Sequence, residues 1–298
     1  MNKELIVIGG PTGVGKTDVA IALASSLNTE IISADSRQIY REMTIGTAVP
    51  DKLQLETIVH HFIQNKSIHE YYNASKYEYE VLELLKSLFT KYEKVILVGG
   101  SGLYIDAVIK GIDDLPEYDP DIRKALKNRI ESEGLEKLKK ELKILDPVSY
   151  KTIDLNNPKR LQKALEISLS TGKPYSEFLK RSPKKRDFSI KTLALNMDRT
   201  ELYDRINQRV INMIENNLVN EARSLLKYKE LNPLNTVGYK EVFSYLEGQI
   251  SLDRAIELIQ NSSRRYARKQ ITWFRKNDRY KWFYPSEIDK MIQYIRDE

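Results

Sequence analysis

The sequence predicts an α/β protein in which helices flank a parallel sheet and a mostly helical domain interrupts the chain. Short apolar runs at residues 5–8, 30–33 and 94–98 alternate with helical stretches, which is typical of a parallel core. From about Pro116 charged helical segments replace the β-branched runs, and residues 189–197 then resemble a strand that rejoins the sheet. We therefore expect a core at 1–115 and 189–298, including the C-terminal helices, and a helical insertion at 116–188.

Composition limits the kind of protein. The chain has 298 residues, 41% of them apolar, which is ample for a core. It contains no cysteine, so disulfides, thiol nucleophiles and zinc sites with cysteine ligands are excluded. We see no secretory leader pattern and no run of about 18 apolar residues, and we expect a cytoplasmic protein without a membrane span. The net charge of +6 is mild evidence for a polyanionic partner.

A glycine-rich turn follows the first predicted strand and leads into a helix that opens near Lys16. Its spacing is that of a phosphate-binding P-loop, in which backbone N–H groups and the helix N-terminus face a diphosphate. Lys16 would supply a cation and Thr17 a hydroxyl ligand for Mg²⁺. A turn that merely connects strand and helix is the alternative. The motif predicts a P-loop NTPase-like core whose phosphate cradle consists of Gly10, Pro11, Thr12, Gly13, Val14, Gly15, Lys16 and Thr17.

The position of the acids argues against ordinary nucleotide hydrolysis. The apolar strand at 94–98 ends in Gly99 and Gly100, where a hydrolase would carry a metal-binding acid. Asp35 instead follows the strand at 30–33 and should face the same crevice as the P-loop. It could be a metal ligand, a general base or a helix N-cap. Ser36 and Gln38 beside it could hydrogen-bond a base edge.

Six segments together resemble the signatures of the bacterial tRNA dimethylallyltransferases, also called the IPP transferase family. In order along residues 5–283 they are GPTGVGKT, ADSRQIYREMTIGTAVP, LVGGSGLYIDAVIKG, NNPKRLQKALEISLSTGKP, VGYKEVFSYLEG and RRYARKQITWFRK. The resemblance implies transfer of a dimethylallyl group from dimethylallyl diphosphate to N6 of the adenosine 3′-adjacent to the anticodon. The P-loop would then hold the departing diphosphate with Mg²⁺, and a monomer would bind the tRNA anticodon stem-loop.

The resemblance also implies catalytic roles for individual residues. Asp35 would accept a proton from the attacking amine, while Lys16 and Thr17 act on the diphosphate. Ser101 stands where the family usually has threonine and keeps the hydroxyl; a serine that only caps the next helix is the alternative. Arg209 would clamp the diphosphate from the side opposite the P-loop. Arg205 lies one turn earlier on the same helix face, where a salt bridge to a neighbouring acid is the alternative.

A second group of residues is expected to bind tRNA. Residues 262–281 are rich in arginine and lysine, and Ala267, Ile271 and Phe274 fall on one side of a helix while the basic residues cover the other. That pattern predicts an anchored helix with a cationic face. The expected tRNA-binding residues are Asp35, Ser36, Arg37, Gln38, Ser101, Arg123, Lys159, Arg160, Leu161, Gln162, Lys163, Arg264, Arg268 and Lys269.

Three other functions remain open from the residues alone. A P-loop small-molecule kinase would use Asp35 to activate a hydroxyl, and a related prenyl transferase would modify free adenine nucleotides. An RNA-binding module with a vestigial loop is the third. The three histidines, His60, His61 and His69, lack the spacing of a metal site and are interpreted as structural.

Overall fold

The computed structural model describes residues 3–116, 119–179 and 182–297. Within them, six strands form one sheet in the order β3-β2-β4-β1-β5-β6, and every neighbouring pair is parallel. This confirms the predicted α/β class. The strands are β1 Glu4–Gly9, β2 Ile31–Ser33, β3 His60–His61, β4 Lys94–Val98, β5 Ser189–Leu195 and β6 Lys281–Phe283.

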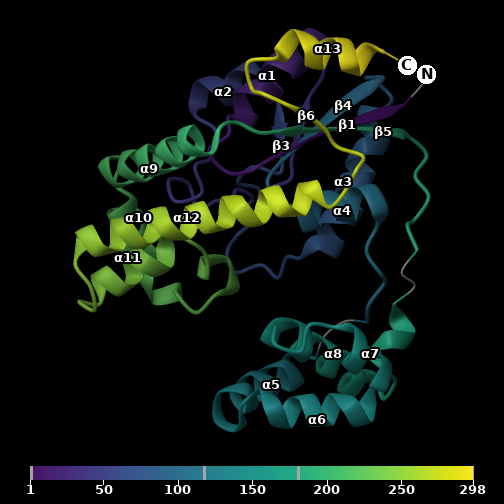
Figure 1. Cartoon of the computed structure of the whole chain (residues 1–298), viewed down its shortest axis with the longest axis vertical. Coiled ribbons are helices and arrows are strands. Elements are labelled where there is room, and N and C mark those ends of the chain that lie inside the picture. The colour runs from purple at the N-terminus through teal and green to yellow at the C-terminus, as the bar shows by residue number, and fades with distance from the viewer. Residues whose placement is uncertain (1–2, 117–118, 180–181, 298) are drawn as a thin grey trace. The chain divides into compact units, whose positions relative to one another are not determined.

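The central strands are buried on both faces, as their continuous apolar runs require. Leu5, Ile6, Val7 and Ile8 of β1 are fully buried between β4 and β5. Figure 1 shows helices α1 and α13 on one side of the sheet and α3 and α4 on the other. These helices are α1 Lys16–Leu27, α3 Ala74–Leu88, α4 Gly102–Lys110 and α13 Ile288–Arg296.

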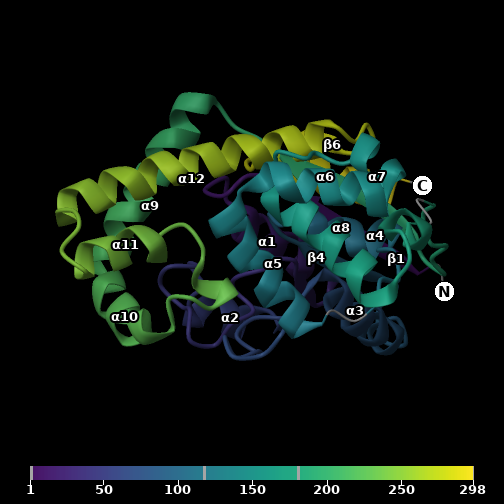
Figure 2. The same ribbon diagram turned by 90° about the horizontal axis from the view of Figure 1, so that it is seen from below.

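A second group of helices extends beyond one end of the sheet. It comprises α9 Arg199–Glu215, α10 Leu218–Leu225, α11 Tyr239–Leu246 and α12 Leu252–Arg275, with 3₁₀ turns at Leu226–Tyr228 and Asn232–Leu234. Helix α2 Lys52–Thr57 precedes β3 and is drawn near α1 in Figure 1. Helix α12 lies beside both α9 and α11 (Figure 2). In the described ranges, no helix is long and apolar enough to cross a membrane.

Helix α12 has the anchored face that the sequence predicted. Ala267 and Phe274 are fully buried. Ile271 packs against the hydrophobic core to which α1 and α9 also contribute side chains. The helix ends at Arg275, however, and a turn leads to β6 at Lys281. The last basic residues of the run are therefore not on the helix, because the chain must return to the sheet edge to pair β6 with β5.

The chain divides into two compact units, with the inserted unit spanning 110–184. These boundaries lie a few residues before the expected 116 and 188. The inserted unit has its own core of leucines from three helices, and Asn157 caps the last of its long helices through Lys159 N–H and Arg160 N–H. Its elements are α5 Pro120–Glu133, α6 Leu135–Leu145, α7 Pro147–Thr152, α8 Pro158–Thr171 and a 3₁₀ turn at Tyr175–Phe178.

Candidate active site

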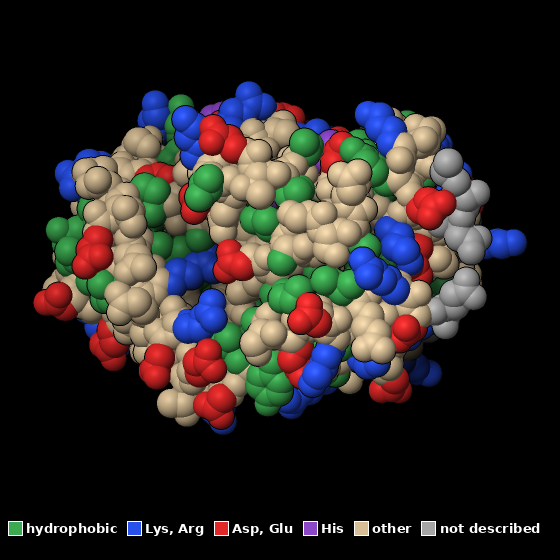
Figure 3. Space-filling model, turned by 90° about the horizontal axis from the view of Figure 1, so that it is seen from above, with side chains coloured by type: hydrophobic (Ala, Val, Ile, Leu, Met, Phe, Trp, Pro, Cys, Tyr) green, Lys and Arg blue, Asp and Glu red, His purple; other side chains and the backbone are tan. Residues whose placement is uncertain are grey.

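A cavity of about 790 Å³ lies at the carboxyl end of β1, β2 and β4. Such edges are where parallel α/β sheets bind ligands. On the face of the molecule drawn in Figure 3 the surface is hollowed, and Lys and Arg side chains lie at the edge of the hollow. The residues that line the cavity and carry polar or charged side chains are Thr12, Lys16, Thr17, Asp18, Ser33, Asp35, Ser36, Arg37, Gln38, Thr47, Asp51, Gln54, His60, Arg205, Arg209, Asn212, Thr236, Ser263, Tyr266 and Gln270.

The P-loop forms one wall. Gly15 has a φ of 92°, in the left-handed region that favours glycine, and it is followed directly by helix α1. Lys16 Nζ donates to the carbonyl of Pro11 at 2.7 Å. Burial lowers the pKa of Lys16 to about 7, with Asp35 opposing the shift and Arg209 adding to it. Val14, in contrast, is part of the hydrophobic core and does not line the cavity.

The predicted metal ligand also lies on this wall. The hydroxyl of Thr17 faces no hydrogen-bond partner among the residues that the structure describes. Nor does the described part of the chain contain a group of three acidic or histidine side chains that could hold a metal ion. A divalent ion at this wall would therefore depend on oxygens of a bound ligand and on water as well as on Thr17.

Asp35 lies across the same cavity. Its Oδ1 accepts hydrogen bonds from the backbone N–H groups of Arg37 at 2.9 Å and Gln38 at 3.3 Å. These bonds fix the carboxylate, while its other oxygen has no partner in the described residues. Turns follow Asp35 and no helix begins before α2, so the N-cap interpretation was wrong.

A hydroxyl cluster borders Asp35. Ser101 Oγ accepts from the N–H of Ser36 at 3.0 Å and lies 3.2 Å from Ser36 Oγ. The hydroxyl thus contacts the β2 loop, and its side chain makes no bond to the first turn of α4. Tyr266 of α12 lines the same cavity with part of its ring exposed, and desolvation of its hydroxyl together with the charge of Asp35 raises its pKa to about 12. Sequence reasoning did not include Tyr266 in the site.

Helix α9 contributes two arginines one turn apart. Nη1 of Arg209 lies 3.4 Å from Thr12 Oγ1, and its Nη2 lies 3.4 Å from the carbonyl of Thr47. Burial lowers the pKa of Arg209, and the charge of Asp35 opposes this. Arg205 is exposed, and among the described residues it forms no ion pair, so the expected alternative of a salt bridge to a neighbouring acid was wrong.

Gln270 connects the P-loop to β4 and was missed in the sequence. Its Oε1 accepts from the N–H of Thr12 at 2.8 Å, and its Nε2 donates to the carbonyl of Gly100 at 2.9 Å. A Cβ at Gly100 would lie 2.2 Å from that Nε2, so glycine is required for this approach. The available signal was a glutamine on the predicted apolar side of α12, where a buried amide needs partners.

Glu221 of α10 supports the opposite wall. Its carboxylate accepts from the backbone N–H groups of Thr44, Ile45 and Gly46 at 2.8–3.0 Å and from Tyr239 Oη at 2.6 Å. One side chain thus satisfies three consecutive amides and fixes the loop that reaches the cavity. No local pattern indicates this, because Glu221 lies far along the chain from the loop that it holds.

Gln38 holds the same loop from the side of β2. Its Nε2 donates to the carbonyls of Thr47 at 3.2 Å and Ala48 at 2.8 Å. The amide N–H₂ expected to read a base edge is therefore engaged by the protein. The carbonyl of Thr47 also contacts Arg209, so Gln38, the loop and the predicted diphosphate clamp form one hydrogen-bonded unit.

The histidines behave mostly as structural residues. His61 Nε2 lies 2.6 Å from Glu30 Oε2, and His69 packs edge-on against Tyr228. His60 lines the cavity, and its Nδ1 lies 2.8 Å from the carbonyl of Ile58. Burial lowers the pKa of His60, and the buried Nε2 has no partner in the described structure.

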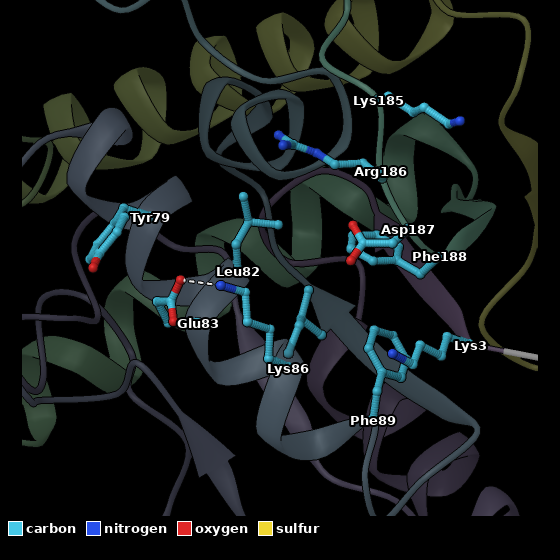
Figure 4. A pocket seen from close by; sticks show the side chains of 11 residues that line it. Lys3, Tyr79, Leu82, Glu83, Lys86, Phe89, Lys185, Arg186, Asp187 and Phe188 are labelled. Atoms are coloured by element: carbon cyan, nitrogen blue, oxygen red, sulfur yellow. Dashed lines mark hydrogen bonds and ion pairs between the residues drawn. The ribbon is translucent and has the colours of Figure 1, made fainter. Parts of the chain in front are cut away.

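A smaller hollow of about 170 Å³ lies at the opposite, amino end of the sheet. Figure 4 shows α3 side chains facing the segment before β5, with Lys86 pointing to Glu83. Arg186 is engaged by Glu78 and by two carbonyls of α4. Lys86, Glu83 and Arg186 are thus paired within the protein, and the larger cavity at the carboxyl end, which holds the P-loop, is the better candidate for catalysis.

Comparison with known proteins decides the family. The IPP transferase family model matches residues 38–277, which is most of the chain. The chain belongs to the IPP transferase family. It is 49% identical over 292 residues to tRNA dimethylallyltransferase 1 of Bacteroides thetaiotaomicron, covering 98% of this chain and 95% of the relative. A tRNA dimethylallyltransferase of Christiangramia forsetii is 50% identical over 292 residues, covering 98% and 97%.

Solved structures agree with this assignment. The full-length tRNA isopentenylpyrophosphate transferase of Bacillus halodurans aligns with a TM-score of 0.72 and 35% identity, covering 99% of this chain and 96% of that one. A eukaryotic dimethylallyltransferase, described as acting on tRNA, aligns with a TM-score of 0.75 and 27% identity over 91% of this chain and 70% of its own. The predicted family and fold are confirmed.

Six of the expected tRNA residues of this IPP transferase lie in the inserted unit, whereas Arg264, Arg268 and Lys269 lie on α12. Arg123 forms a bidentate ion pair with the buried Glu166, at 2.8 and 3.2 Å, and Lys163 lies 3.4 Å from the same carboxylate. Gln162 donates to the carbonyl of Arg123. Leu161 is buried in the leucine core. Lys159 and Arg160, at the start of α8, are exposed.

Proposed function

We propose that this IPP transferase moves the dimethylallyl group of dimethylallyl diphosphate to N6 of the adenosine 3′-adjacent to the anticodon of tRNA, releasing diphosphate. One observation carries the proposal: the partly buried cations Lys16 and Arg209, beside the P-loop, line the same cavity as a fixed carboxylate with a free oxygen. The names of the relatives support the same activity.

Cationic groups surround the expected position of the diphosphate. Lys16 belongs to the P-loop and Arg209 lies 3.4 Å from Thr12 of the same loop, so both cations can stabilise the negative charge that develops on the leaving group. Mg²⁺ would be held by the Thr17 hydroxyl together with diphosphate oxygens, and it would neutralise further charge. Because no carboxylate cage is present in the described residues, such an ion would bind with the substrate.

The proton of the reaction goes to Asp35. The carbon–oxygen bond to the diphosphate breaks, a bond from N6 to that carbon forms, and the nitrogen loses one proton to the free oxygen of the carboxylate. Hydrogen bonds from Arg37 and Gln38 N–H groups keep this carboxylate in place. The hydroxyls of Ser101 and Ser36 lie next to it and can orient the purine.

The experiment follows radiolabel from dimethylallyl diphosphate in the presence of Mg²⁺ and either tRNA or AMP. We expect label in tRNA and none in AMP. Asp35→Ala should abolish transfer with little loss of tRNA binding, whereas Asp253→Ala, an exposed acid in the first turn of α12, should leave transfer unchanged. Normal turnover by the Asp35 variant would refute its role as the base, and phosphate transfer from ATP would favour a kinase.

A further inference from the structure

Three arginines surround one tyrosine on the seam between α9 and α12, away from the diphosphate cradle. Arg199 Nε and Arg268 Nη1 each donate to the hydroxyl of Tyr203, at 3.1 and 3.0 Å. The guanidinium of Arg264 lies 5.9 Å from the centre of the same ring, and that of Arg199 lies 5.2 Å from it. Helices α9 and α12 lie side by side in Figures 1 and 2, so the cluster joins residues distant in sequence.

The positive charge of this cluster is not balanced within the protein. Among the described residues no carboxylate lies within 4.0 Å of Arg199, Arg264 or Arg268, although other arginines of the chain have such partners. Because Arg199 and Arg268 both donate to the hydroxyl oxygen of Tyr203, their donor nitrogens are no more than about 6 Å apart. Like charges held this close repel each other, and a bound anion would relieve the repulsion.

The protein nevertheless orients these side chains firmly. Arg264 donates to the side-chain oxygens of Asn207 and Asn261, one on each helix. Tyr203 accepts from two guanidinium groups, which uses both lone pairs of its oxygen and leaves its O–H as a donor. Desolvation raises the pKa of Tyr203, but the hydrogen bonds and positive charges of Arg199 and Arg268 outweigh this effect and lower it. The cluster therefore offers N–H and O–H donors and no further acceptor.

A ligand for such a site must be an anion that only accepts hydrogen bonds. A phosphodiester fits this chemistry, since its two free oxygens accept from paired guanidinium groups. We propose that Arg199, Tyr203, Arg264 and Arg268 form a binding site for one backbone phosphate of the RNA substrate. This rests on the proposed function for the identity of the RNA, but it adds Arg199 and Tyr203, which lie outside the cationic face predicted for α12.

The site should contribute to affinity through counterion release. Each neutralised phosphate steepens the dependence of log affinity on log salt concentration by roughly 0.7 to 0.9. Arg268→Gln should therefore flatten the salt dependence of tRNA binding by about that amount and weaken binding roughly tenfold at low salt. Tyr203→Phe removes an uncharged hydroxyl, which donates to the anion and accepts from Arg199 and Arg268, so it should weaken binding several-fold while the slope stays the same.

The matched control is Arg254→Gln. Arg254 is on the same helix and its loss changes the net charge equally, but it pairs with Glu257 and lies outside the cluster. Binding is measured by filter retention of labelled tRNA at several salt concentrations without prenyl substrate, so the result does not depend on transfer. Thermal unfolding of each variant, and the KM for dimethylallyl diphosphate, should remain at the wild-type values. If Arg268→Gln does not fold, Arg199→Gln replaces it in the same experiment. Arg268→Lys keeps the charge and should retain the wild-type dependence of tRNA affinity on salt.

Two outcomes would overturn the proposal. In the first, Arg268→Gln and Arg199→Gln show the same slope and affinity as Arg254→Gln. In the second, the variants bind tRNA normally but lose affinity for ATP, measured by calorimetry, which would assign the cluster to a free nucleotide.

Discussion

The buried amine of Lys16 makes diphosphate binding sensitive to pH. With its pKa lowered to about 7, Lys16 is largely neutral at pH 8 in the ligand-free cavity. A bound diphosphate brings several negative charges to the P-loop and should restore the protonated amine. Binding then takes up about 0.9 proton at pH 8, and affinity falls about 50-fold between pH 7 and 9 if Lys16 alone responds. The terminal phosphate ionises near pH 6, so the charge of the ligand is constant over this range.

Isothermal titration calorimetry measures this uptake directly. Dimethylallyl diphosphate is titrated at pH 8 without tRNA, so that no turnover occurs, in two buffers of different ionisation enthalpy. Lys16→Arg is the control, because a guanidinium does not titrate in this range. Its affinity should vary little between pH 7 and 9. The reasoning fails if the wild type takes up no proton at pH 8, or if Lys16→Arg takes up as many.

Three further predictions follow from the same contacts. Lys16→Met removes an amine whose pKa is about 7 in the folded protein and about 10 in the unfolded chain. Between these values the unfolded state binds more protons, so the free energy of unfolding of the wild type rises with pH. The gain in that free energy on substitution, measured by urea unfolding, should therefore be roughly 2 kcal/mol larger at pH 7 than at pH 9. Glu221→Gln replaces an acceptor of three amides and should raise the KM for dimethylallyl diphosphate about tenfold through the Thr47 loop, while circular dichroism stays unchanged; an unaltered KM would contradict this. Ser101→Thr keeps the hydroxyl and should retain transfer, whereas Ser101→Ala should lower kcat about tenfold with tRNA affinity preserved; equal kcat in both variants would argue against a role for the hydroxyl.

Local pattern predicted the parts of the site that follow a strand directly. Lys16 and Asp35 each come just after a buried apolar run, and parallel strands end at one edge, so their proximity was foreseeable. Gln270 and Glu221 act across long stretches of sequence on backbone groups, which carry no sequence signal of their own. For Arg123 the sequence was misleading in the other direction, because its place on a polar helix gave no indication of the buried partner Glu166.

A P-loop alone does not determine the reaction, and the neighbouring strand shows why this one suits group transfer. In a hydrolase the strand beside β1 ends in an acid that helps to hold the metal. Here Gly99 and Gly100 follow β4, and Gln270 occupies the space next to them, joining the P-loop to Gly100 by two hydrogen bonds. After the strand beyond, β2, the chain instead carries Asp35, whose carboxylate accepts two backbone N–H groups at the edge of the cradle. The cavity thus favours a reaction in which the phosphates depart and the acid acts on the incoming nucleophile.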